Sequence, residues 1–492
     1  MTITGKSTMT TFPFDPSSVT PYYRQIYDGY RMAILSGLLR PGERLPSTRA
    51  LAAELGISRL PAVYAFDQLL HEGYIEGRTG SGTYVKESIP DELATAASST
   101  STPTPAASKK THAQLRADER ARLAPLRVSL PALDRFPVPL WSKLVSKHAK
   151  QFTVEQMAYG HPAGYVPLRE AVADYLRTAR AVRCEADQVL IVSGSQMALQ
   201  ITALSLLGRG TTVCIEEPGY PGAHAALARG GTRIVPVPVD DEGIDVDALT
   251  AKGRKVRAVY VTPSHQYPLG VSMTASRRLA LLEWARRIGA WIIEDDYDSE
   301  YRYASRPLGA LQGIDASRVI YIGTFSKVLF PSLRLGYVVV PRSLIDDFTR
   351  HRESIDLFSP VLEQAVLAEF LRDGHFGRHL RRMRALYEKR RDALVRGLRE
   401  HAATLVPHNS DAGLHVSTFL PEGIDDRVIV RECARRGIEA TALSTCYVGE
   451  HPRNGLILGF GGASERRILA ACKTLGEVLG KCPGGEVRYR PG

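Results

Sequence analysis

The residue best placed for covalent chemistry is Lys327, which follows a strand-like run that ends at Ile322. Two small hydroxyl residues, Thr324 and Ser326, come just before it, and Arg334 follows on its C-terminal side. A lysine amine forms a Schiff base with a carbonyl group, and an arginine binds phosphate through paired hydrogen bonds. The segment predicts a Schiff-base lysine beside a phosphate-binding arginine, although a lone lysine in a loop is usually only solvated.

Other residues complete a site for an aldehyde cofactor, pyridoxal 5'-phosphate (PLP), which needs an acid, a ring-oxygen donor, a stacking ring and a phosphate site. Asp295 closes a strand-like run, and Tyr297 lies two residues further on, as expected at the ligand-binding edge of an α/β sheet. Ser195 stands where a strand ends and a helix begins, so backbone N–H groups there can bind phosphate. Tyr220 follows another strand and would stack on the ring, although alone it is equally typical of a turn.

The 492-residue chain is long enough for two or more domains, and its 44% hydrophobic and 23% charged residues are typical of globular proteins. From residue 128 to the C-terminus, short apolar runs alternate with amphipathic helices. This predicts an α/β domain with a parallel or mixed sheet, followed by a smaller α+β subdomain after Pro341. Residues 87–127 are rich in Ala, Ser, Thr and Pro and predict a flexible linker. The expected strands are residues 188–193, 211–216, 256–262, 290–295, 318–322, 335–340, 414–420 and 455–460, and the expected helices include 196–207, 274–288 and 426–436.

Residues 20–86 carry three helix signals followed by a glycine-punctuated hairpin. Ser47 is a good N-cap for the second helix, and Ser58 is a good N-cap for the third. Two short helices joined through a glycine predict a helix-turn-helix, and Gly80 and Gly82 predict a two-stranded wing. The alternative is a small helical adaptor domain without a DNA-binding role.

The segments Leu45–Ala52, Gly56–Arg59 and Gly80–Thr83 closely resemble the GntR-type winged helix. The resemblance implies that this module binds double-stranded operator DNA. Leu60 and Pro61 depart from the polar residues that usually follow in that family, which leaves base specificity open. The positions that the resemblance assigns to DNA binding are Ser47, Arg49, Ser58, Arg59, Gly80 and Gly82.

The chain from about residue 130 resembles the fold type I aminotransferases, and within them the aminotransferase-like domain of MocR-type regulators. The resemblance is carried by residues 159–169, 262–270, 294–298 and the Lys327 segment. It implies that Lys327 forms the PLP aldimine and that the chain is a homodimer in which Tyr159 reaches the partner's site. It assigns the pyridine nitrogen to Asp295, the ring oxygen to Tyr297, the ring stack to Tyr220, and the phosphate to Ser195, Gln196, Thr324 and Arg334.

Two positions depart from the enzyme pattern. Tyr267 stands where aminotransferases of this fold have an asparagine that touches the ring oxygen, and Ile457 stands where they have the arginine that binds the substrate α-carboxylate. An isoleucine cannot pair with a carboxylate, which argues against efficient transamination but not against aldimine formation. The residues left as candidates to bind an effector are Arg453, His265 and Gln266.

These features together indicate a PLP-dependent transcriptional regulator. An amine, an amino-acid-like compound or a B6 vitamer would act at the aldimine and alter operator binding or transcription. One alternative is an active aminotransferase with a fused DNA-binding domain. Another is a DNA-binding protein whose large domain has lost its cofactor and serves only for dimerisation.

Charge and cysteine usage add little to this hypothesis. The net charge of +11 does not establish DNA binding, because residues 1–90 hold nine Lys/Arg and eight Asp/Glu, a net of only +1. The six cysteines include no C-x-x-C pair, and no metal site is expected. Without a signal peptide or an apolar run of membrane-spanning length, the expected location is the cytoplasm.

Overall fold

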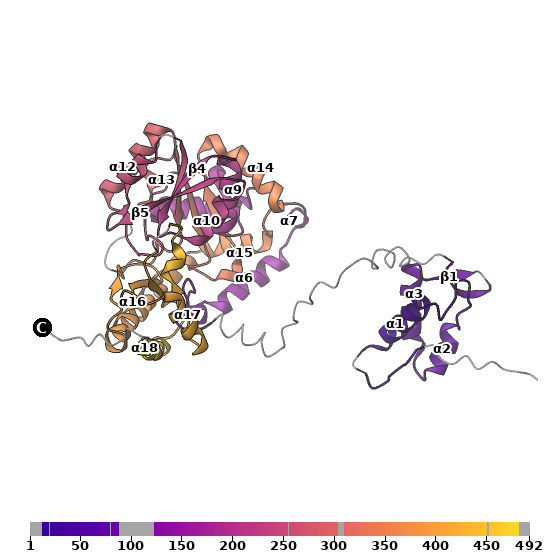
Figure 1. Cartoon of the computed structure of the whole chain (residues 1–492). Coiled ribbons are helices and arrows are strands. Elements are labelled where there is room, and N and C mark those ends of the chain that lie inside the picture. Colours follow the sequence, from indigo (N-terminus) through magenta and orange to yellow (C-terminus); the bar gives the residue numbers. More distant parts are fainter. Residues whose placement is uncertain are drawn as a thin grey trace, which may run out of the picture. The chain divides into compact units, whose positions relative to one another are not determined.

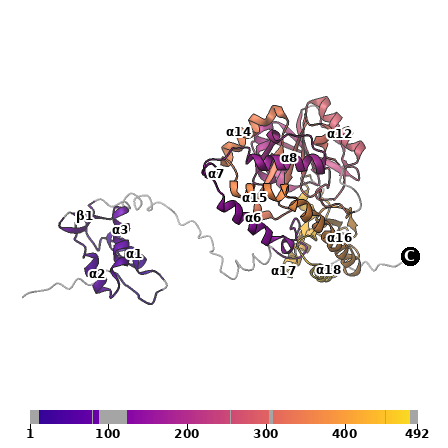
Figure 2. The ribbon, with the colours of Figure 1, turned by 180° about the vertical axis from the view of Figure 1, so that it is seen from behind.

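A computed structural model describes residues 12–18, 20–78, 80–87, 123–253, 255–303, 309–449 and 452–481 (Figures 1 and 2). The chain divides into two compact units, residues 1–109 and 110–492. The Ala/Ser/Thr/Pro-rich part of the expected linker lies outside the described residues. In the part of the chain that is described, no helix has the length and apolar character needed to cross a membrane.

The first unit is a winged helix-turn-helix, which confirms the expected fold. Its core gathers apolar residues from all three helices and from the wing, including the fully buried Ile26, Leu51, Leu69 and Val85. The two wing strands pair in antiparallel register, with Ile75 opposite Val85. The elements are α1 (Tyr22–Leu35), α2 (Thr48–Glu54), α3 (Arg59–His71), β1 (Ile75–Arg78) and β2 (Gly82–Val85).

The second unit is built on an eight-stranded mixed sheet with the order β3-β10-β9-β8-β7-β4-β5-β6. Its central strands are parallel, whereas β10 pairs antiparallel with both β3 and β9. This confirms the expected α/β fold with a mixed sheet. The strands are β3 (Val189–Val192), β4 (Thr212–Glu217), β5 (Arg233–Asp240), β6 (Gly243–Ile244), β7 (Val256–Val261), β8 (Trp291–Asp296), β9 (Val319–Thr324) and β10 (Gly336–Val339).

Helices cover both faces of this sheet, so strands such as β3 are apolar at every position. Ile191 of β3 packs in a cluster with Leu168 of α8, whereas its neighbour Leu190 packs with Leu199 of α9. Successive side chains of a strand point to opposite faces, so the two helices lie on opposite sides. Figure 1 presents the α9 side and Figure 2 the α8 side. The helices up to residue 372 are α6 (Val138–Lys150), α7 (Val154–Met157), α8 (Val166–Arg180), α9 (Ser195–Leu206), α10 (Pro221–Leu227), α11 (Val246–Ala251), α12 (Ala275–Ile288), α13 (Leu311–Ile314), α14 (Ile345–Asp356) and α15 (Val361–Arg372).

The C-terminal part forms the expected α+β subdomain, with a four-stranded antiparallel sheet in the order β11-β12-β14-β13. Its longest helix, α16, packs against the last helix, α18. The elements are α16 (His375–His401), β11 (Pro407–His408), β12 (His415–Phe419), α17 (Asp426–Arg435), β13 (Thr441–Ala442), β14 (Gly455–Gly459) and α18 (Glu465–Leu479).

The packed part of the second unit begins before residue 128, where the flexible linker was expected to end. Ala124, Pro125 and Leu126 are buried. The Glu439 N–H donates to the Pro125 carbonyl at 3.0 Å, and the Gly459 N–H donates to the Leu126 carbonyl at 2.8 Å. The last residues of the expected linker therefore lie along the edge of β14, because their apolar side chains can be buried there.

Candidate functional site

A cavity of about 180 Å³ gathers eight of the nine residues predicted to hold the cofactor. Strands β4, β7, β8 and β9 run parallel, so the residues at their carboxyl ends meet at one edge of the sheet. The ninth residue, Tyr159, does not line the cavity and is 86% exposed, with its ring edge-on to Phe358. The cavity is lined by Ser129, Ser195, Gln196, Tyr220, Tyr260, Thr262, Tyr267, Asp295, Tyr297, Thr324, Ser326, Lys327, Pro331 and Arg334.

Lys327 offers a nucleophilic amine to this cavity. Its Nζ donates a hydrogen bond to the Ser129 carbonyl at 3.1 Å. Burial lowers the pKa of Lys327 to about 8, although the carboxylates of Asp298 and Asp295 act in the opposite direction. A lower pKa gives a larger share of neutral amine near neutral pH, which is the form that attacks a carbonyl carbon.

Asp295, near the end of β8, has one engaged and one unpartnered carboxylate oxygen. The Tyr260 hydroxyl donates to Oδ2 at 2.8 Å, whereas Oδ1 is buried with no partner among the described residues. Burial raises the pKa of Asp295 to about 7, and the hydrogen bond from Tyr260 opposes this rise. A buried oxygen without a donor is costly, so this carboxyl group is suited to a cationic N–H donor in the cavity.

The opposite end of the cavity is built to hold an anion. Gly194, with a φ of 100°, precedes α9, whose first two residues line the cavity. A Cβ on Gly194 would lie 3.2 Å from the Arg334 guanidinium, which donates to the Ser193 carbonyl. The N–H groups at a helix start and a guanidinium are both phosphate ligands, and Thr324 adds a hydroxyl to the cavity wall.

Aromatic rings form the walls between these two ends. The ring of Tyr267 lies edge-on to Tyr220, with centroids 5.5 Å apart, and to Tyr297, with centroids 6.2 Å apart. Gln196 Nε2 donates to the Tyr220 hydroxyl at 3.3 Å. The Tyr297 hydroxyl donates to the His265 carbonyl at 2.9 Å. These contacts fix the orientation of rings that could stack on a flat ligand.

The three residues predicted to bind an effector do not line the cavity. Gln266 is buried and donates to the carbonyls of Pro218 and Tyr267, so its amide stabilises the surrounding turns. The exposed Arg453 places its guanidinium 3.7 Å from the centroid of the Phe419 ring. The third residue, His265, is buried.

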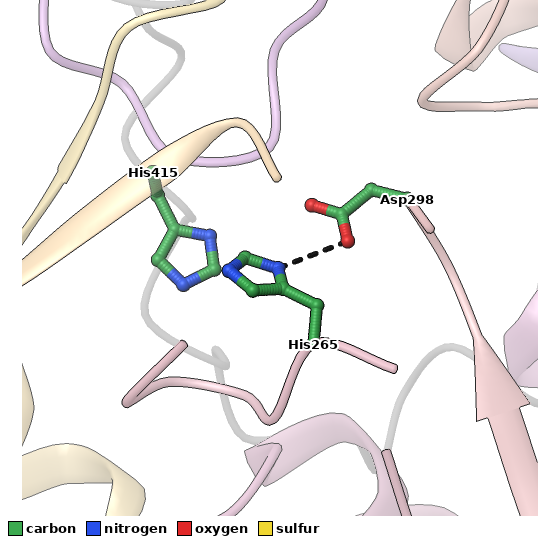
Figure 3. A group of neighbouring side chains, drawn as sticks. All are labelled: His265, Asp298 and His415. Atoms are coloured by element: carbon green, nitrogen blue, oxygen red, sulfur yellow. Dashed lines mark hydrogen bonds and ion pairs between the residues drawn. The ribbon is translucent and has the colours of Figure 1, made fainter. Parts of the chain in front are cut away.

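His265 belongs to a buried cluster with Asp298 and His415 (Figure 3). His265 Nδ1 lies 3.0 Å from Asp298 Oδ1, and one candidate ligand atom from each residue lies within 4.8 Å of the others. A Cβ on Gly413 would lie 1.9 Å from His265 Cε1 and 2.7 Å from Asp298 Oδ2. The Gly413 backbone therefore packs directly against these two side chains, and His265 Nε2 is buried without a hydrogen-bond partner among the described residues.

The predicted DNA-binding residues lie at the exposed starts of two helices and at the wing. Ser47 caps α2 by accepting from the Ala50 N–H at 3.1 Å, whereas Ser58 precedes α3 without a capping bond. Arg49 and Arg59 are exposed, and Arg59 Nε donates to Thr48 Oγ1 at 3.1 Å. In the wing, the two predicted glycines, Gly80 and Gly82, have φ of 75° and 123°.

Each of the two units matches a known protein family. Residues 137–455 match the family "Aminotransferase class I and II", and residues 22–85 match "Bacterial regulatory proteins, gntR family". A Rhizobium meliloti protein named "Probable rhizopine catabolism regulatory protein MocR" is 39% identical over 467 residues, which are 94% of each chain. The chain belongs to the MocR-type transcriptional regulators.

Two further similarities support both halves of this MocR-type regulator. The pyridoxine biosynthesis transcriptional regulator PdxR of Corynebacterium glutamicum is 32% identical over 93% of this chain and 96% of its own. The crystal structure of Pyrococcus horikoshii kynurenine aminotransferase, in complex with PMP, matches with a TM-score of 0.68 and 27% identity. It covers 77% of this chain and 96% of its own.

The cavity residues of the MocR-type regulator fit PLP, the cofactor of this fold. The unpartnered Oδ1 of Asp295 suits the protonated ring nitrogen, and the start of α9 with Arg334 suits the phosphate. Lys327 supplies the amine that would hold the aldehyde carbon. The fit depends on the buried Oδ1 of Asp295. Buried polar atoms in proteins are nearly always hydrogen-bonded, so an oxygen without a partner indicates that a ligand supplies the donor.

At the position where an arginine was expected to bind the substrate carboxylate, the regulator has an isoleucine. Ile457 of β14 is fully buried in an apolar cluster with Leu269, Val271, Leu443 and Cys446, and Tyr267 packs against that cluster. Among the described residues that line the cavity, the cations are Lys327 and Arg334. The position at which the carboxylate-binding arginine was expected therefore lies in apolar surroundings.

Sequence reasoning missed several cavity residues. Tyr260 is the second-last residue of β7, and the adjacent parallel strand β8 carries Asp295. A tyrosine near the carboxyl end of a mostly apolar strand was a usable signal. Ser129 carried no comparable signal, because it comes directly after the expected linker and reaches the site only through tertiary packing.

Proposed function

We propose that this MocR-type regulator senses a small molecule at the Lys327 cavity and changes DNA binding or transcription without sustained transamination. One observation carries the proposal: eight of the nine residues predicted to hold the cofactor line one cavity, whereas Ile457, at the position where an arginine was expected to bind the carboxylate, is buried in an apolar cluster. A cofactor site that does not anchor a carboxylate suits recognition better than turnover.

The side chains divide the binding task between them. Lys327 and Asp295 hold the two reactive ends of the PLP ring, and Arg334 with Ser195 holds the phosphate. When bound, PLP supplies an aldehyde that reacts with amines and a protonated ring that withdraws electrons. The effectors that fit are amines, B6 vitamers and amino-acid-like compounds whose carboxylate, if present, is anchored away from Ile457.

The proposed partners are double-stranded operator DNA and a second copy of the chain. Tyr159 lies in a segment that also exposes Val154 and Met157, which are 78% and 68% exposed. An exposed apolar group of this kind suits burial in a homodimer. An effector that binds two dimer conformations with different affinities would shift their populations and thereby alter operator binding.

The sensing role is tested by measuring DNA affinity with and without ligand. The DNA would be a site selected from a random pool by the full-length protein. We expect Lys327→Ala to bind this DNA with unchanged affinity but to lose any response to PLP and to candidate amines. Visible cofactor absorbance should also disappear. A protein with no absorbance before the substitution, and no change after it, would instead be a dimerisation scaffold.

The DNA-contact residues are tested separately in the winged helix. Arg59→Ala and Arg49→Ala should each weaken binding by about 1–2 kcal/mol, and loss of a phosphate contact should reduce the salt slope by about one. Arg24→Ala is a matched control, because Arg24 is an exposed arginine of α1 paired with Asp28 at 3.0 Å. Equal losses in the variants and in the control would refute the assignment.

An active aminotransferase is the second candidate, because eight of the nine predicted cofactor residues line the cavity and the pKa of Lys327 is lowered. It predicts continuous release of a keto acid from an amino donor. The sensing function predicts at most one equivalent per cofactor. Counting equivalents of keto acid released by the full-length protein separates the two.

A further inference from the structure

One wall of the cofactor cavity comes from the segment Ala124–Leu130, which follows the chain that leads from the winged helix. Within it, Ser129 lines the cavity and its carbonyl accepts the hydrogen bond from Lys327 Nζ at 3.1 Å. The reactive amine is therefore bonded to the first packed residues of the sensing unit.

Other polar contacts also hold this segment. The Gly459 and Glu439 N–H groups donate to the carbonyls of Leu126 and Pro125, and Arg127 forms an ion pair with Glu439 at 2.8 Å. The Gly459 contact lies past the end of β13, which pairs with β14 only at residues 456 and 457. The segment thus occupies an edge of β14 that β13 leaves open.

The backbone of the segment is strained at two positions. Leu126 and Ser129 have φ of 67° and 65°, in the left-handed region that residues other than glycine rarely adopt. Such conformations persist where surrounding contacts hold them, and they relax when those contacts are lost. The chain is fixed just after the C-terminal end of the segment, because the Ala132 N–H donates to the buried Tyr387 hydroxyl at 2.9 Å.

We propose that the segment Ala124–Leu130 senses the chemical state of Lys327, because the free ammonium group anchors it and the cofactor-bound nitrogen does not. When the amine condenses with an aldehyde, a carbon–nitrogen double bond forms and the carbonyl oxygen leaves as water. That water takes both hydrogens of the neutral amine. The Lys327 nitrogen then carries no hydrogen, or a single hydrogen if it is protonated. That hydrogen lies in the plane of the carbon–nitrogen double bond and cannot turn toward the Ser129 carbonyl as the free ammonium group does.

The role of this anchor in regulation rests on the proposed sensing function. An effector that frees Lys327 from the cofactor would restore the anchor, and formation of the covalent link would loosen it. The loosened residues are covalently continuous with the path to the winged helix. The covalent state of Lys327 Nζ thereby decides how firmly the segment Ala124–Leu130, from which the connecting chain leads to the winged helix, is held.

Hydrogen exchange of the full-length protein, free of DNA and effector, tests this proposal. The reporters are the Gly459 and Glu439 amides, which donate to the segment, and the Ile293 amide at the centre of β8 is the folding control. In cofactor-free protein, Lys327→Met should speed exchange of both reporters about tenfold, as expected for losing a hydrogen bond from a charged donor. Lys327→Arg keeps a cation and should leave the reporters protected, and Lys473→Met, at an exposed lysine of α18, should change nothing.

Added PLP gives the second arm of the experiment. It should speed exchange of the same reporters in the wild type and not in Lys327→Met, and inorganic phosphate alone should have no effect. Equal protection in wild type and Lys327→Met without cofactor would overturn the proposal. So would a PLP effect of equal size in both proteins, or no effect of PLP on a wild type whose visible absorbance shows covalent binding. DNA and effector responses are measured separately, so the sensing function can fail while this anchor stands, and the reverse.

Discussion

The two sides of the Lys327 cavity differ sharply in what they retain. On the cofactor side, Lys327, Asp295 and Arg334 occupy positions suited to an aldehyde, a ring nitrogen and a phosphate. On the other side, Tyr267 lines the cavity and packs against an apolar cluster, and Ile457, at the position of the expected carboxylate-binding arginine, lies inside that cluster. The cofactor residues are therefore kept while an isoleucine replaces the arginine expected to bind a carboxylate, a combination that suits the proposed sensing role.

The substrate side is firmly built around this apolar arrangement. The buried Glu216 accepts from the Thr262 N–H at 3.1 Å and from its hydroxyl at 2.6 Å. The same hydroxyl accepts from the Tyr267 N–H at 2.9 Å, and Gln266 donates to the Tyr267 carbonyl at 2.7 Å. Tyr267 is thus held at its backbone on both sides, so a single substitution should not recreate an enzyme site.

The largest expected effect comes from restoring the missing arginine. Ile457→Arg places an unpaired cation in an apolar cluster, so it should lower the free energy of unfolding by about 3–5 kcal/mol. Urea unfolding followed by tryptophan fluorescence measures this loss, because Trp141, Trp284 and Trp291 all belong to the second unit. Ile457→Val is the control and should cost about 1 kcal/mol.

A stable Ile457→Arg protein that released keto acid continuously would break the comparison. It would mean that one side chain separates sensing from turnover and that the apolar cluster adapts to a charge. Keto-acid release is therefore measured on the same protein preparation.

The next effect is a pH dependence on the cofactor side. The pKa of Asp295 is about 7 in the folded protein, against an ordinary value of 3.8. Between these pH values the unfolded chain has lost a proton that the folded chain keeps, so stability falls as pH rises from 4 to 7. Asp295→Asn should remove roughly 2–4 kcal/mol of this fall in cofactor-free protein.

Other carboxyl groups titrate in the same pH range. Burial also raises the pKa values of Glu216, Glu294 and Glu300 to about 7, and the charge of Asp295 adds to the rise at Glu216, so Asp295→Asn removes that contribution as well. The pKa of Lys327 is lowered to about 8, so its contribution is lost below pH 8 and constant from 4 to 7. Parallel stability curves for wild type and Asp295→Asn would show that Asp295 is ionised in the empty cavity.

The sequence predicted the fold better than it predicted which residues line the cavity. The winged helix and most strands of the large sheet follow from periodicity, caps and apolar runs, which are local signals. Strand β5 was not predicted, because Pro236 and Pro238 interrupt it and only its place near the sheet edge tolerates them. The Ser129 wall was also not predictable, since it depends on a contact between residues far apart in the sequence.

A smaller effect tests how Asp295 is held. Tyr260→Phe removes the donor to Oδ2, so the Kd for PLP should rise about tenfold, or about 1.4 kcal/mol. Tyr321→Phe is the matched control, because Tyr321 donates at 2.6 Å to Asp296, which does not line the cavity. Equal affinity for PLP in Tyr260→Phe and wild type would show that the backbone of β8 alone positions the carboxyl group.

The smallest expected effect is at Arg453, which the sequence suggested as a residue that binds an effector. Its guanidinium lies over Phe419, outside the cavity, so Arg453→Ala should cost about 0.5–1 kcal/mol of stability and leave the response to amines unchanged. Titrating DNA affinity with amines, with and without a carboxylate, measures that response. A tenfold loss confined to the carboxylate-bearing amines would mean that Arg453 leaves Phe419 and enters the cavity on binding. The substrate side would then be completed by a moving residue, and the difference between the two sides would lie in mobility instead of in chemistry.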